Sequence, residues 1–163
     1  MADTPQFRIA NTSDAELLLD FMRDYYAFDG HGFDGEEARA ALIPLLENPH
    51  FGRIWIILDG DSPIGYAVIC FGYSLEWLGR DAFIDELYLV EAHRGRGWGR
   101  RTMAFLEDAA RELGIRALHL AVVKGNRTAL QLYERVGFCK HESTFLSKWI
   151  ASDLSKPPSR PRA

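Results

Sequence analysis

The stretch Arg94-Gly95-Arg96-Gly97-Trp98-Gly99 joins a run of apolar residues typical of a strand, residues 83–90, to a periodic segment typical of a helix, residues 98–113. Glycine lets the backbone turn sharply and leaves its N–H groups uncovered. The helix that follows presents further N–H groups and the positive end of its dipole to the same place. The stretch therefore predicts a strand-turn-helix unit that binds an anion, most simply a pyrophosphate.

Three phosphate-binding motifs can be compared with this turn. A Walker loop requires Gly-Lys-Ser/Thr at its end, and here Gly99 is followed by Arg100. A dinucleotide fingerprint requires a third glycine three places after the second, and it requires an acidic residue after the next strand, where this chain has Lys124. The pattern Arg-x-x-Gly-x-Gly, formed by Arg94, Gly97 and Gly99, does fit. A glycine-rich turn without a ligand is the structural alternative.

A second motif follows at residues 126–138, which read Asn-Arg-Thr-Ala-Leu-Gln-Leu-Tyr-Glu-Arg-Val-Gly-Phe. Asn126 and Tyr133 are seven residues apart, which is two helical turns, so they share one face of the predicted helix. Taken singly, Asn126 is more typical of a helix cap and Tyr133 of a core aromatic residue. Together with the glycine turn upstream, the pair favours a binding site.

These two motifs resemble those of the GNAT superfamily of acetyl-CoA-dependent N-acetyltransferases. The family's patterns are (Gln/Arg)-x-x-Gly-x-(Gly/Ala) between a strand and a helix, and downstream Asn-x-x-Ala-x-x-x-Tyr-x-x-x-Gly-Phe. The resemblance covers residues 6–149 and is strongest over 83–138. It implies an α/β GNAT fold: a mixed, mostly antiparallel twisted sheet with flanking helices and a splayed central strand pair, here residues 83–90 and 117–123.

The resemblance also implies where acetyl-CoA, the co-substrate, binds. The pyrophosphate is expected on the turn, the backbone of the preceding strand is expected to pair with the pantetheine arm, and an asparagine is expected to bind that arm from the other side. The residues that match are Arg94, Gly95, Arg96, Gly97, Trp98, Gly99 and Arg100 for the pyrophosphate, Leu87, Tyr88 and Leu89 for the arm, and Asn126 opposite them.

Three residues are expected to carry the chemistry. By the resemblance, Tyr133 donates its phenolic proton to the departing thiolate. An alkyl amine has a pKa near ~10 and is protonated at pH 7, so a base or a desolvating pocket is needed. Asp85 and Glu86 match the paired acids of diamine acetyltransferases, and the choice between them stays open. Neighbours on a strand point to opposite faces, so only one is expected to face the acetyl group. A carboxylate that caps a neighbouring loop is the alternative.

Charge patterning suggests the acceptor. Residues 1–50 contain ten acids and three bases, whereas residues 94–101 contain four arginines and no acid. The acidic loop 24–37 also carries aromatic side chains, which can face a cation. This pattern favours a small cationic amine (polyamine-like, an aminoglycoside or an amino-acid derivative), although solvated surface acids explain the same residues. The alternatives are a protein lysine or N-terminal acetyltransferase and a non-catalytic acyl-CoA-binding module.

The rest of the sequence describes an ordinary globular domain. Of 163 residues, 47% are apolar and 26% charged, so we expect one domain over 1–150 and a disordered tail over 151–163. We expect no metal site, because the two cysteines and the histidines lack ligand spacing. The net charge of −4 disfavours nucleic acid. No signal peptide or membrane span is apparent, so a cytoplasmic location is expected, and a homodimer stays open.

Further elements are predicted from periodicity and turn signals. Residues 6–10 are expected to form an edge strand, and Ser13-Asp14-Ala15-Glu16 is expected to be a capping box that opens a helix. A second helix over 36–47 is expected to be kinked or split at Pro44. Two strands over 53–58 and 64–72 form a hairpin, and one or two last strands are expected over 139–149.

Overall fold

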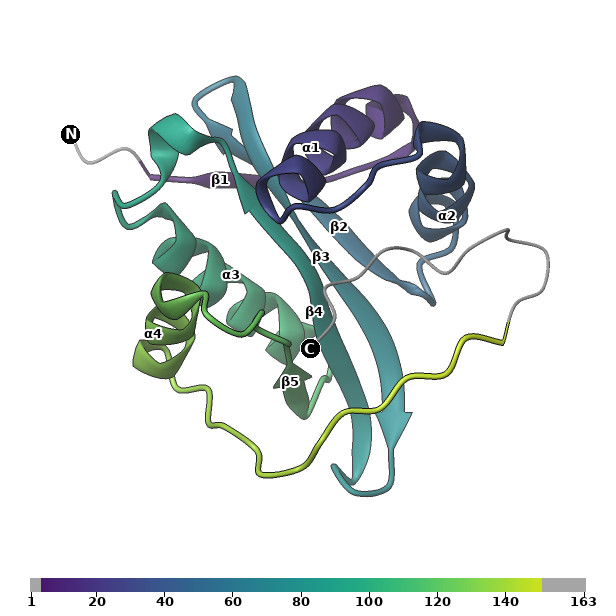
Figure 1. Cartoon of the computed structure of the whole chain (residues 1–163), viewed down its shortest axis with the longest axis vertical. Coiled ribbons are helices and arrows are strands. Elements are labelled where there is room, and N and C mark those ends of the chain that lie inside the picture. The colour runs from purple at the N-terminus through teal and green to yellow at the C-terminus, as the bar shows by residue number, and fades with distance from the viewer. Residues whose placement is uncertain (1–3, 151–163) are drawn as a thin grey trace.

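The computed structural model describes residues 4–150, which form a mixed α/β structure (Figure 1). Residues 1–3 and 151–163 are outside the described part, so the expected C-terminal tail over 151–163 lies outside it as well. Within residues 4–150, no helix is both long and apolar enough to cross a membrane.

A five-stranded sheet in the order β1-β2-β3-β4-β5 forms the centre of the molecule. Strands β1 to β4 are antiparallel neighbours, and β5 pairs with β4 in parallel after a crossover through α3. The prediction of a mixed, mostly antiparallel sheet is confirmed. The strands are β1 (Gln6–Ile9), β2 (Gly52–Asp59), β3 (Ser62–Ser74), β4 (Gly79–Leu89) and β5 (Ala117–His119). The helices are α1 (Ala15–Phe28), α2 (Gly35–Glu47), α3 (Trp98–Glu112) and α4 (Arg127–Arg135), with 3-10 turns η1 (Thr12–Asp14) and η2 (Glu91–His93).

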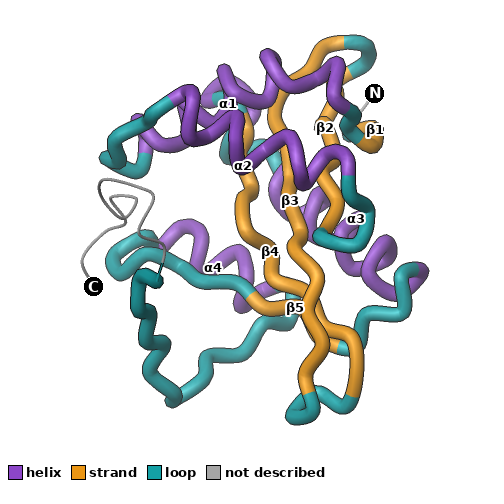
Figure 2. The backbone as a smooth tube through the Cα atoms, turned by 90° about the vertical axis from the view of Figure 1, so that its right-hand side faces the viewer, coloured by secondary structure: helices purple, strands orange, loops and turns teal. Residues whose placement is uncertain are grey.

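Helices cover both faces of the sheet, with α1 and α2 on one face and α3 and α4 on the other (Figures 1 and 2). Successive side chains of a strand point to opposite faces, so β3 supplies both cores. Tyr66 and Val68 pack under α1 and α2, whereas Ala67 and Ile69 pack under α3. Burying one such aliphatic or aromatic side chain is worth about 1.5–3 kcal/mol, so the two cores hold the layers together.

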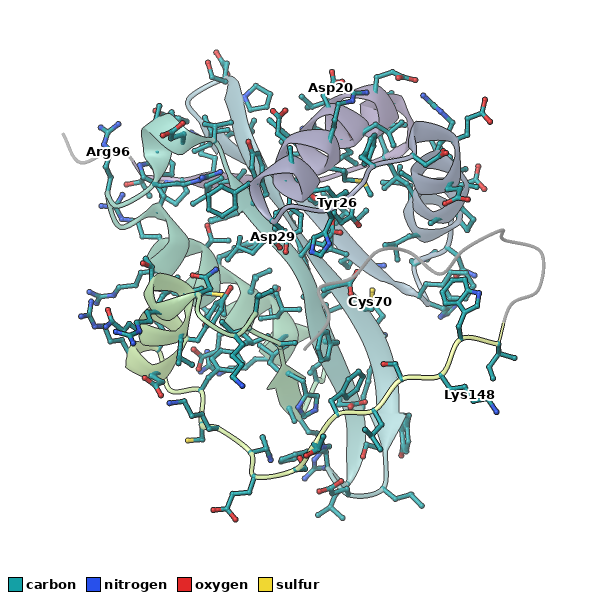
Figure 3. All side chains as sticks on the ribbon, in the orientation of Figure 1. Asp20, Tyr26, Asp29, Cys70, Arg96 and Lys148 are labelled. Atoms are coloured by element: carbon teal, nitrogen blue, oxygen red, sulfur yellow. The ribbon has the colours of Figure 1, made fainter. Side chains whose placement is uncertain are left out.

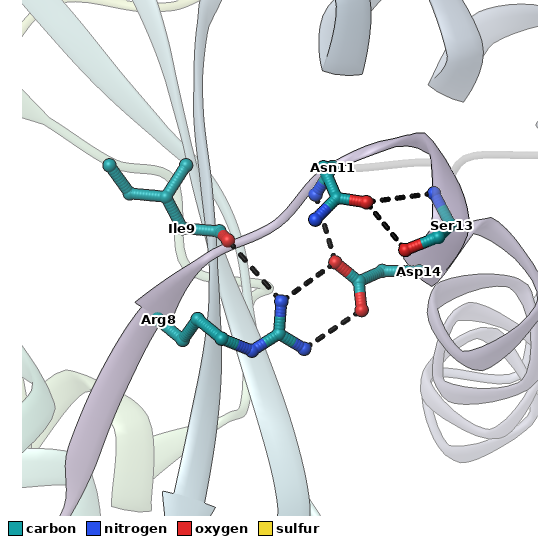
Figure 4. Close-up of polar contacts among 5 residues, drawn as sticks. All are labelled: Arg8, Ile9, Asn11, Ser13 and Asp14. Carbon is teal, nitrogen blue, oxygen red and sulfur yellow. Dashed lines mark hydrogen bonds and ion pairs between the residues drawn. The ribbon is translucent and has the colours of Figure 1, made fainter.

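A polar network joins the end of β1 to the start of α1 (Figure 4). Arg8 donates to both carboxylate oxygens of Asp14, at 2.8 and 2.9 Å, and the Asn11 backbone N–H donates to Asp14 at 2.9 Å. The Asn11 side chain in turn accepts from the Ser13 N–H at 2.9 Å. The capping box is therefore formed by Asn11 and Asp14, two residues earlier than the predicted Ser13–Glu16 pair, because a 3-10 turn precedes α1.

Two predicted elements differ in extent from those observed. α2 runs through Pro44 as one helix, so the expected split is wrong. Proline removes one N–H donor from a helix, and here the packing of Leu42 and Leu45 against the core outweighs that loss. β5 is only three residues long, Ala117–His119, because β4 and β5 diverge after it.

Residues 139–150 form neither helix nor strand, so the expected strands over 139–149 are wrong. Residues 140–144 are all polar, and the apolar side chains after them do not alternate as a half-buried strand requires. The short β5 also offers only a short edge for another strand to join. The segment instead touches the β3–β4 hairpin, where His141 packs edge-on to Trp77 with 5.7 Å between ring centroids.

Candidate active site between strands β4 and β5

Strand β4 contains a β-bulge at Asp85. Ile84 pairs with Ile69 of β3 and Glu86 pairs with the adjacent Val68, so Asp85 has no partner residue on β3. An extra residue of this kind breaks the alternation of side chains along the strand and bends it.

The bulge changes which face the following side chains occupy. Ile84 packs in the core under α3, whereas Tyr88, four residues later, packs in the core under α1. Without the bulge both would point to the same face, because their separation is even. Glu86 therefore points toward α1, and the expectation that Asp85 and Glu86 occupy opposite faces of a regular strand is wrong.

Glu86 is held by two phenols from different elements. The Tyr26 hydroxyl of α1 donates to Oε1 at 2.7 Å, and the Tyr66 hydroxyl of β3 donates to Oε2 at 2.6 Å. Burial raises the pKa of both phenols, and the charge of Glu86 raises it further. Both tyrosines therefore stay protonated as donors, and each carboxylate oxygen accepts a short charge-assisted hydrogen bond.

Asp85 is exposed and lies near the same group of side chains. The charges of Asp85 and Glu86 both add to the effect of burial in raising the pKa of Cys70 to about 11. The two carboxylates thus form one anionic site around Tyr26 and Cys70, with Glu86 hydrogen-bonded to two phenols and Asp85 exposed to solvent.

β4 and β5 separate immediately before the bulge. Their pairing covers Asp81 to Phe83 of β4 and Ala117 to His119 of β5. Beyond it, a cavity of about 130 Å³ lies between the diverging chains. Its walls are Leu87, Tyr88, Leu89 and Arg94 on the β4 side; Ala121, Val122, Val123, Asn126, Ala129 and Tyr133 on the β5–α4 side; and Tyr25, Phe28 and Asp29 from the end of α1. The predicted splayed strand pair is confirmed.

Tyr133 and Asn126 reach this cavity from α4. Asn126 caps α4 by accepting from the Ala129 N–H at 3.1 Å, which leaves its NH₂ group as a donor. The Tyr133 ring packs edge-on to Phe138, with 6.0 Å between centroids. Burial raises the pKa of the Tyr133 phenol, and the charge of Asp29 raises it further. Tyr133 is therefore protonated at neutral pH and can act as a proton donor.

The glycine turn has the backbone that an anion site requires. Gly95 and Gly97 have φ of +71° and +84°, and a Cβ on either would meet no heavy atom within 4 Å. Gly97 is the N-cap of α3, and no side chain caps this helix. The first N–H groups of α3 thus have no side-chain cap, as expected for a helix end that binds phosphate.

Two side chains beside the turn have structural partners. The Arg94 Nε donates to the Leu89 carbonyl at 2.8 Å, and its guanidinium lies 4.3 Å above the Phe28 ring. His93 Nε2 lies 3.1 Å from Asp59, and the His93 ring packs edge-on to Trp98. Arg94 thereby links the turn to the end of α1, and His93 links it to the β2–β3 hairpin.

Comparison with known proteins identifies the family. The profile described as "Acetyltransferase (GNAT) family" matches residues 16–138. The chain belongs to the GNAT acetyltransferase family. It is therefore a member of a family of acyltransferase enzymes, as predicted.

Individual GNAT relatives agree with this assignment. The chain is 46% identical over 99 residues to an uncharacterized N-acetyltransferase, YycN, of Bacillus subtilis, a match covering 60% of this chain and 62% of YycN. It is 27% identical over 146 residues to the thialysine N-epsilon-acetyltransferase of Mus musculus, covering 84% and 85% of the two chains. The solved structure of an integron cassette protein from the mobile metagenome of Cole Harbour Salt Marsh superposes with a TM-score of 0.80 at 29% identity, covering 90% of this chain and 91% of that one.

The structure brings most of the predicted GNAT residues to one place. Leu87, Tyr88, Leu89, Arg94, Asn126 and Tyr133 line the cavity, and the turn from Gly95 to Arg100 lies at the start of α3. Asp85 and Glu86 lie on the α1 side of β4 and do not line this cavity. Figure 3 shows Arg96 well away from Tyr26 and Asp29, on the turn before α3.

Three site residues were not singled out from the sequence. Tyr26 and Asp29 belong to the acidic and aromatic loop 24–37, which is predicted to face a cationic acceptor, but the sequence does not predict the contact of Tyr26 with Glu86 or the place of Asp29 in the cavity wall. The sequence does not mark Tyr66 as a site residue, because an isolated tyrosine in an apolar strand has the pattern of a core residue. Only the pairing of β3 with β4 places Tyr66 opposite Tyr88 and beside Glu86.

A larger cavity of about 810 Å³ lies on the other side of α4. Its lining comes from α3, residues 115–126 with β5, α4, residues 136–141 and Trp77, and it shares Val122, Val123, Asn126 and Tyr133 with the smaller cavity. The segment after Gly137 does not pair with β5, which leaves this space open. The described residues contain no group of three or more His, Cys, Asp or Glu side chains that could hold a metal ion.

Proposed function

We propose that the protein is an acetyl-CoA-dependent N-acetyltransferase that acylates a primary amine of a small cationic molecule. The observation that carries this proposal is the cavity between the diverging β4 and β5, which has a protonated phenol, Tyr133, on one wall. On the α1 side, the cavity lies beside an aromatic and acidic group of side chains that suits a cation.

The turn and the cavity walls fit acetyl-CoA. The backbone N–H groups from Gly95 to Arg100 would bind the pyrophosphate, since the positive-φ glycines leave them uncovered. The unpaired edge of β4 over Leu87–Leu89 would hydrogen-bond the pantetheine arm as a strand does. The NH₂ group of Asn126 would bind the same arm from α4.

The reaction would be a direct attack in a ternary complex. The amine nitrogen forms a C–N bond with the thioester carbon, the C–S bond breaks, and the thiolate takes the proton of Tyr133. The nitrogen then loses its second proton, which returns to the Tyr133 phenolate through water and leaves a neutral amide. The ammonium proton must leave before the attack. Asp85 is open to solvent and can accept it through water, whereas Glu86 already accepts two hydrogen bonds and acts through its charge. A backbone N–H near Leu89 would stabilise the oxyanion.

The nature of the acceptor is supported by the surroundings of Glu86. Tyr26 stacks near Tyr25 at 5.7 Å between centroids, His31 packs edge-on to Tyr26, and Phe33 lies 5.8 Å from Tyr26. Aromatic faces around a carboxylate attract ammonium groups. The mouse relative is named a thialysine N-epsilon-acetyltransferase, and thialysine is a small molecule whose amino groups are protonated at neutral pH.

The proposal is tested by following free-thiol release from acetyl-CoA across polyamines, aminoglycosides, amino acids including thialysine, and lysine peptides. We expect release with one class of small amine, and slower release in Tyr133→Phe and in the pair Asp85→Asn and Glu86→Gln. Release only with lysine peptides would replace the small amine by a protein acceptor. Acetyl-CoA binding without release for any amine would instead favour a non-catalytic binding module.

A further inference from the structure

Asp29 closes the C-terminal end of α1. It is the C-cap residue, and its backbone N–H donates to the Tyr25 carbonyl at 3.0 Å. The C-terminus of a helix carries partial negative charge, so a carboxylate there is unfavourable unless a cation is near. The last turn of α1 contains no basic residue. Among residues 4–150, Asp29 takes part in no ion pair.

Asp29 also faces the proposed reaction centre. It is the single carboxylate among the described residues that line the 130 Å³ cavity, and Tyr133 lies on the opposite wall. Asp85 and Glu86, the acids singled out from the sequence, do not line it. Figure 3 shows Tyr26 and Asp29 together at the end of α1, close to β4, whereas Asp20 of the same helix lies on its outer surface.

The neighbours of Asp29 respond to its charge. After burial, Asp29 is the next largest cause that raises the pKa of Tyr25, and it is the next largest for Tyr133 as well. The one basic side chain among the cavity residues is Arg94, and its guanidinium is engaged by the Leu89 carbonyl and the Phe28 ring. Arg94 keeps its positive charge over Phe28 but forms no ion pair with Asp29 within residues 4–150. The Asp29 carboxylate has the Tyr25 phenol as a hydrogen-bond partner and can accept further hydrogen bonds from a ligand.

We propose that Asp29, together with the terminal carbonyl groups of α1, binds the ammonium group of the acceptor beside Tyr133 and makes the enzyme select cationic amines. This assignment rests on the proposed acetyltransfer. The ammonium group must lose its proton before it attacks the thioester, so Asp29 acts in binding the acceptor and not in the chemical step.

The test compares Asp29→Asn with Asp20→Asn, which removes the same charge from an exposed position of the same helix, paired with Arg23. With acetyl-CoA and thialysine, we expect Asp29→Asn to raise the KM for thialysine by about tenfold or more, the loss expected for a hydrogen bond to a charged group. The KM for acetyl-CoA should stay unchanged, Asp20→Asn should match the parent protein, and Asp29→Glu should restore part of the affinity. An unchanged KM for thialysine in Asp29→Asn would overturn the proposal.

A second measurement separates this proposal from the proposed function. Tetramethylammonium is a permanent cation that cannot be acetylated, and its binding can be titrated by NMR with ¹³C-labelled tyrosine. We expect its addition to shift the Tyr133 signal in the parent protein and in Asp20→Asn, and to have at least tenfold weaker effect in Asp29→Asn. If the parent protein releases no thiol with any amine, the proposed acetyltransferase function is wrong. The titration still shows whether Asp29 binds a cation. Equal binding by Asp29→Asn overturns its role.

Discussion

Tyr66 and Glu86 are joined across the β3–β4 strand pair, with the buried Tyr66 hydroxyl 2.6 Å from Oε2 of Glu86. The contact exists because the bulge at Asp85 turns Glu86 toward the face that Tyr66 occupies. A carboxylate at this depth is costly unless its oxygens accept hydrogen bonds. Tyr66 and Tyr26 supply one each, so the anionic site is part of the fold as well as of the proposed chemistry.

Tyr66→Phe should lower the free energy of unfolding by about 1.5–3 kcal/mol, the range for a hydrogen bond to a charged group. The change removes one oxygen and leaves the ring in the core. Urea denaturation should show a lower midpoint with an unchanged m value. In a double-mutant cycle with Glu86→Gln, the two changes should be strongly non-additive. Simple additivity would mean that the two side chains do not stabilise each other.

Tyr133→Phe should lower kcat by about 10²-fold, at the low end for general acid catalysis, because phenol is a weak acid. The KM for acetyl-CoA should change little, because the ring and its contact with Phe138 remain. Steady-state thiol release measures both constants. A rise in KM at constant kcat would show that Tyr133 binds a substrate and does not donate a proton.

The sequence and the structure agree best where function depends on local geometry. The turn from Arg94 to Gly99 and the seven-residue separation of Asn126 and Tyr133 are local patterns, and both lie where they were predicted. The bulge at Asp85 depends instead on how β4 pairs with β3, which no single strand encodes. Because the sequence does not show the bulge, it predicts Asp85 and Glu86 on opposite faces of a regular strand. It also does not identify Tyr66 as a hydrogen-bond partner of Glu86.

The failures elsewhere have a similar cause. The strands expected over 139–149 require an edge to pair with, and the short β5 does not provide a long one. The split at Pro44 follows from local propensity, and tertiary packing of Leu42 overrides it. Local patterns thus predict turns and helix faces, whereas strand registers and edges depend on residues far away in the chain.

Gly97→Ala should raise the KM for acetyl-CoA about tenfold or more, since forcing a side chain into positive φ costs about 1–2 kcal/mol and the turn must change its backbone. The added Cβ meets open space, so no steric clash contributes. The matched control is Gly114→Ala, which has φ +70° and open space at the far end of α3. Gly114→Ala should lose similar stability in thermal unfolding and keep the parent KM. Equal KM changes in both variants would mean a general loss of stability.

Cys70 should react about 100-fold more slowly with a disulfide reagent at pH 8 than the exposed Cys139, because its pKa of about 11 leaves little thiolate. Burial is the main cause, and the charges of Asp85 and Glu86 add to it. Asp85→Asn should therefore accelerate the slow thiol, because removal of this negative charge lowers the pKa of Cys70. Stopped-flow absorbance resolves the two phases, and an unaffected slow phase would show that Asp85 lies too far from the thiol to act on it.

Asp14→Asn should destabilise the protein by about 1–2 kcal/mol at pH 7, because it removes a carboxylate that accepts two hydrogen bonds from Arg8 and one from the Asn11 backbone. The loss stays in this range because the Arg8 side chain is 44% exposed and solvent partly screens its ion pair with Asp14. The hydrogen bond to Arg8 is the largest effect on the pKa of Asp14, which is lowered.

A lowered pKa in the folded state sets the direction of the pH dependence. Such a carboxylate stabilises the fold fully above its unfolded pKa of about 3.9, and the contribution disappears as the pH falls through the lower folded value. The difference in unfolding free energy between the parent and Asp14→Asn should therefore stay constant from pH 7 to 5 and decrease below pH 4. Urea denaturation across this range measures it, with the exposed Asp20→Asn as a control that should cost less than about 0.5 kcal/mol at every pH. A difference that grows as the pH falls would contradict the assignment, because it would require a raised pKa for Asp14 in the folded protein.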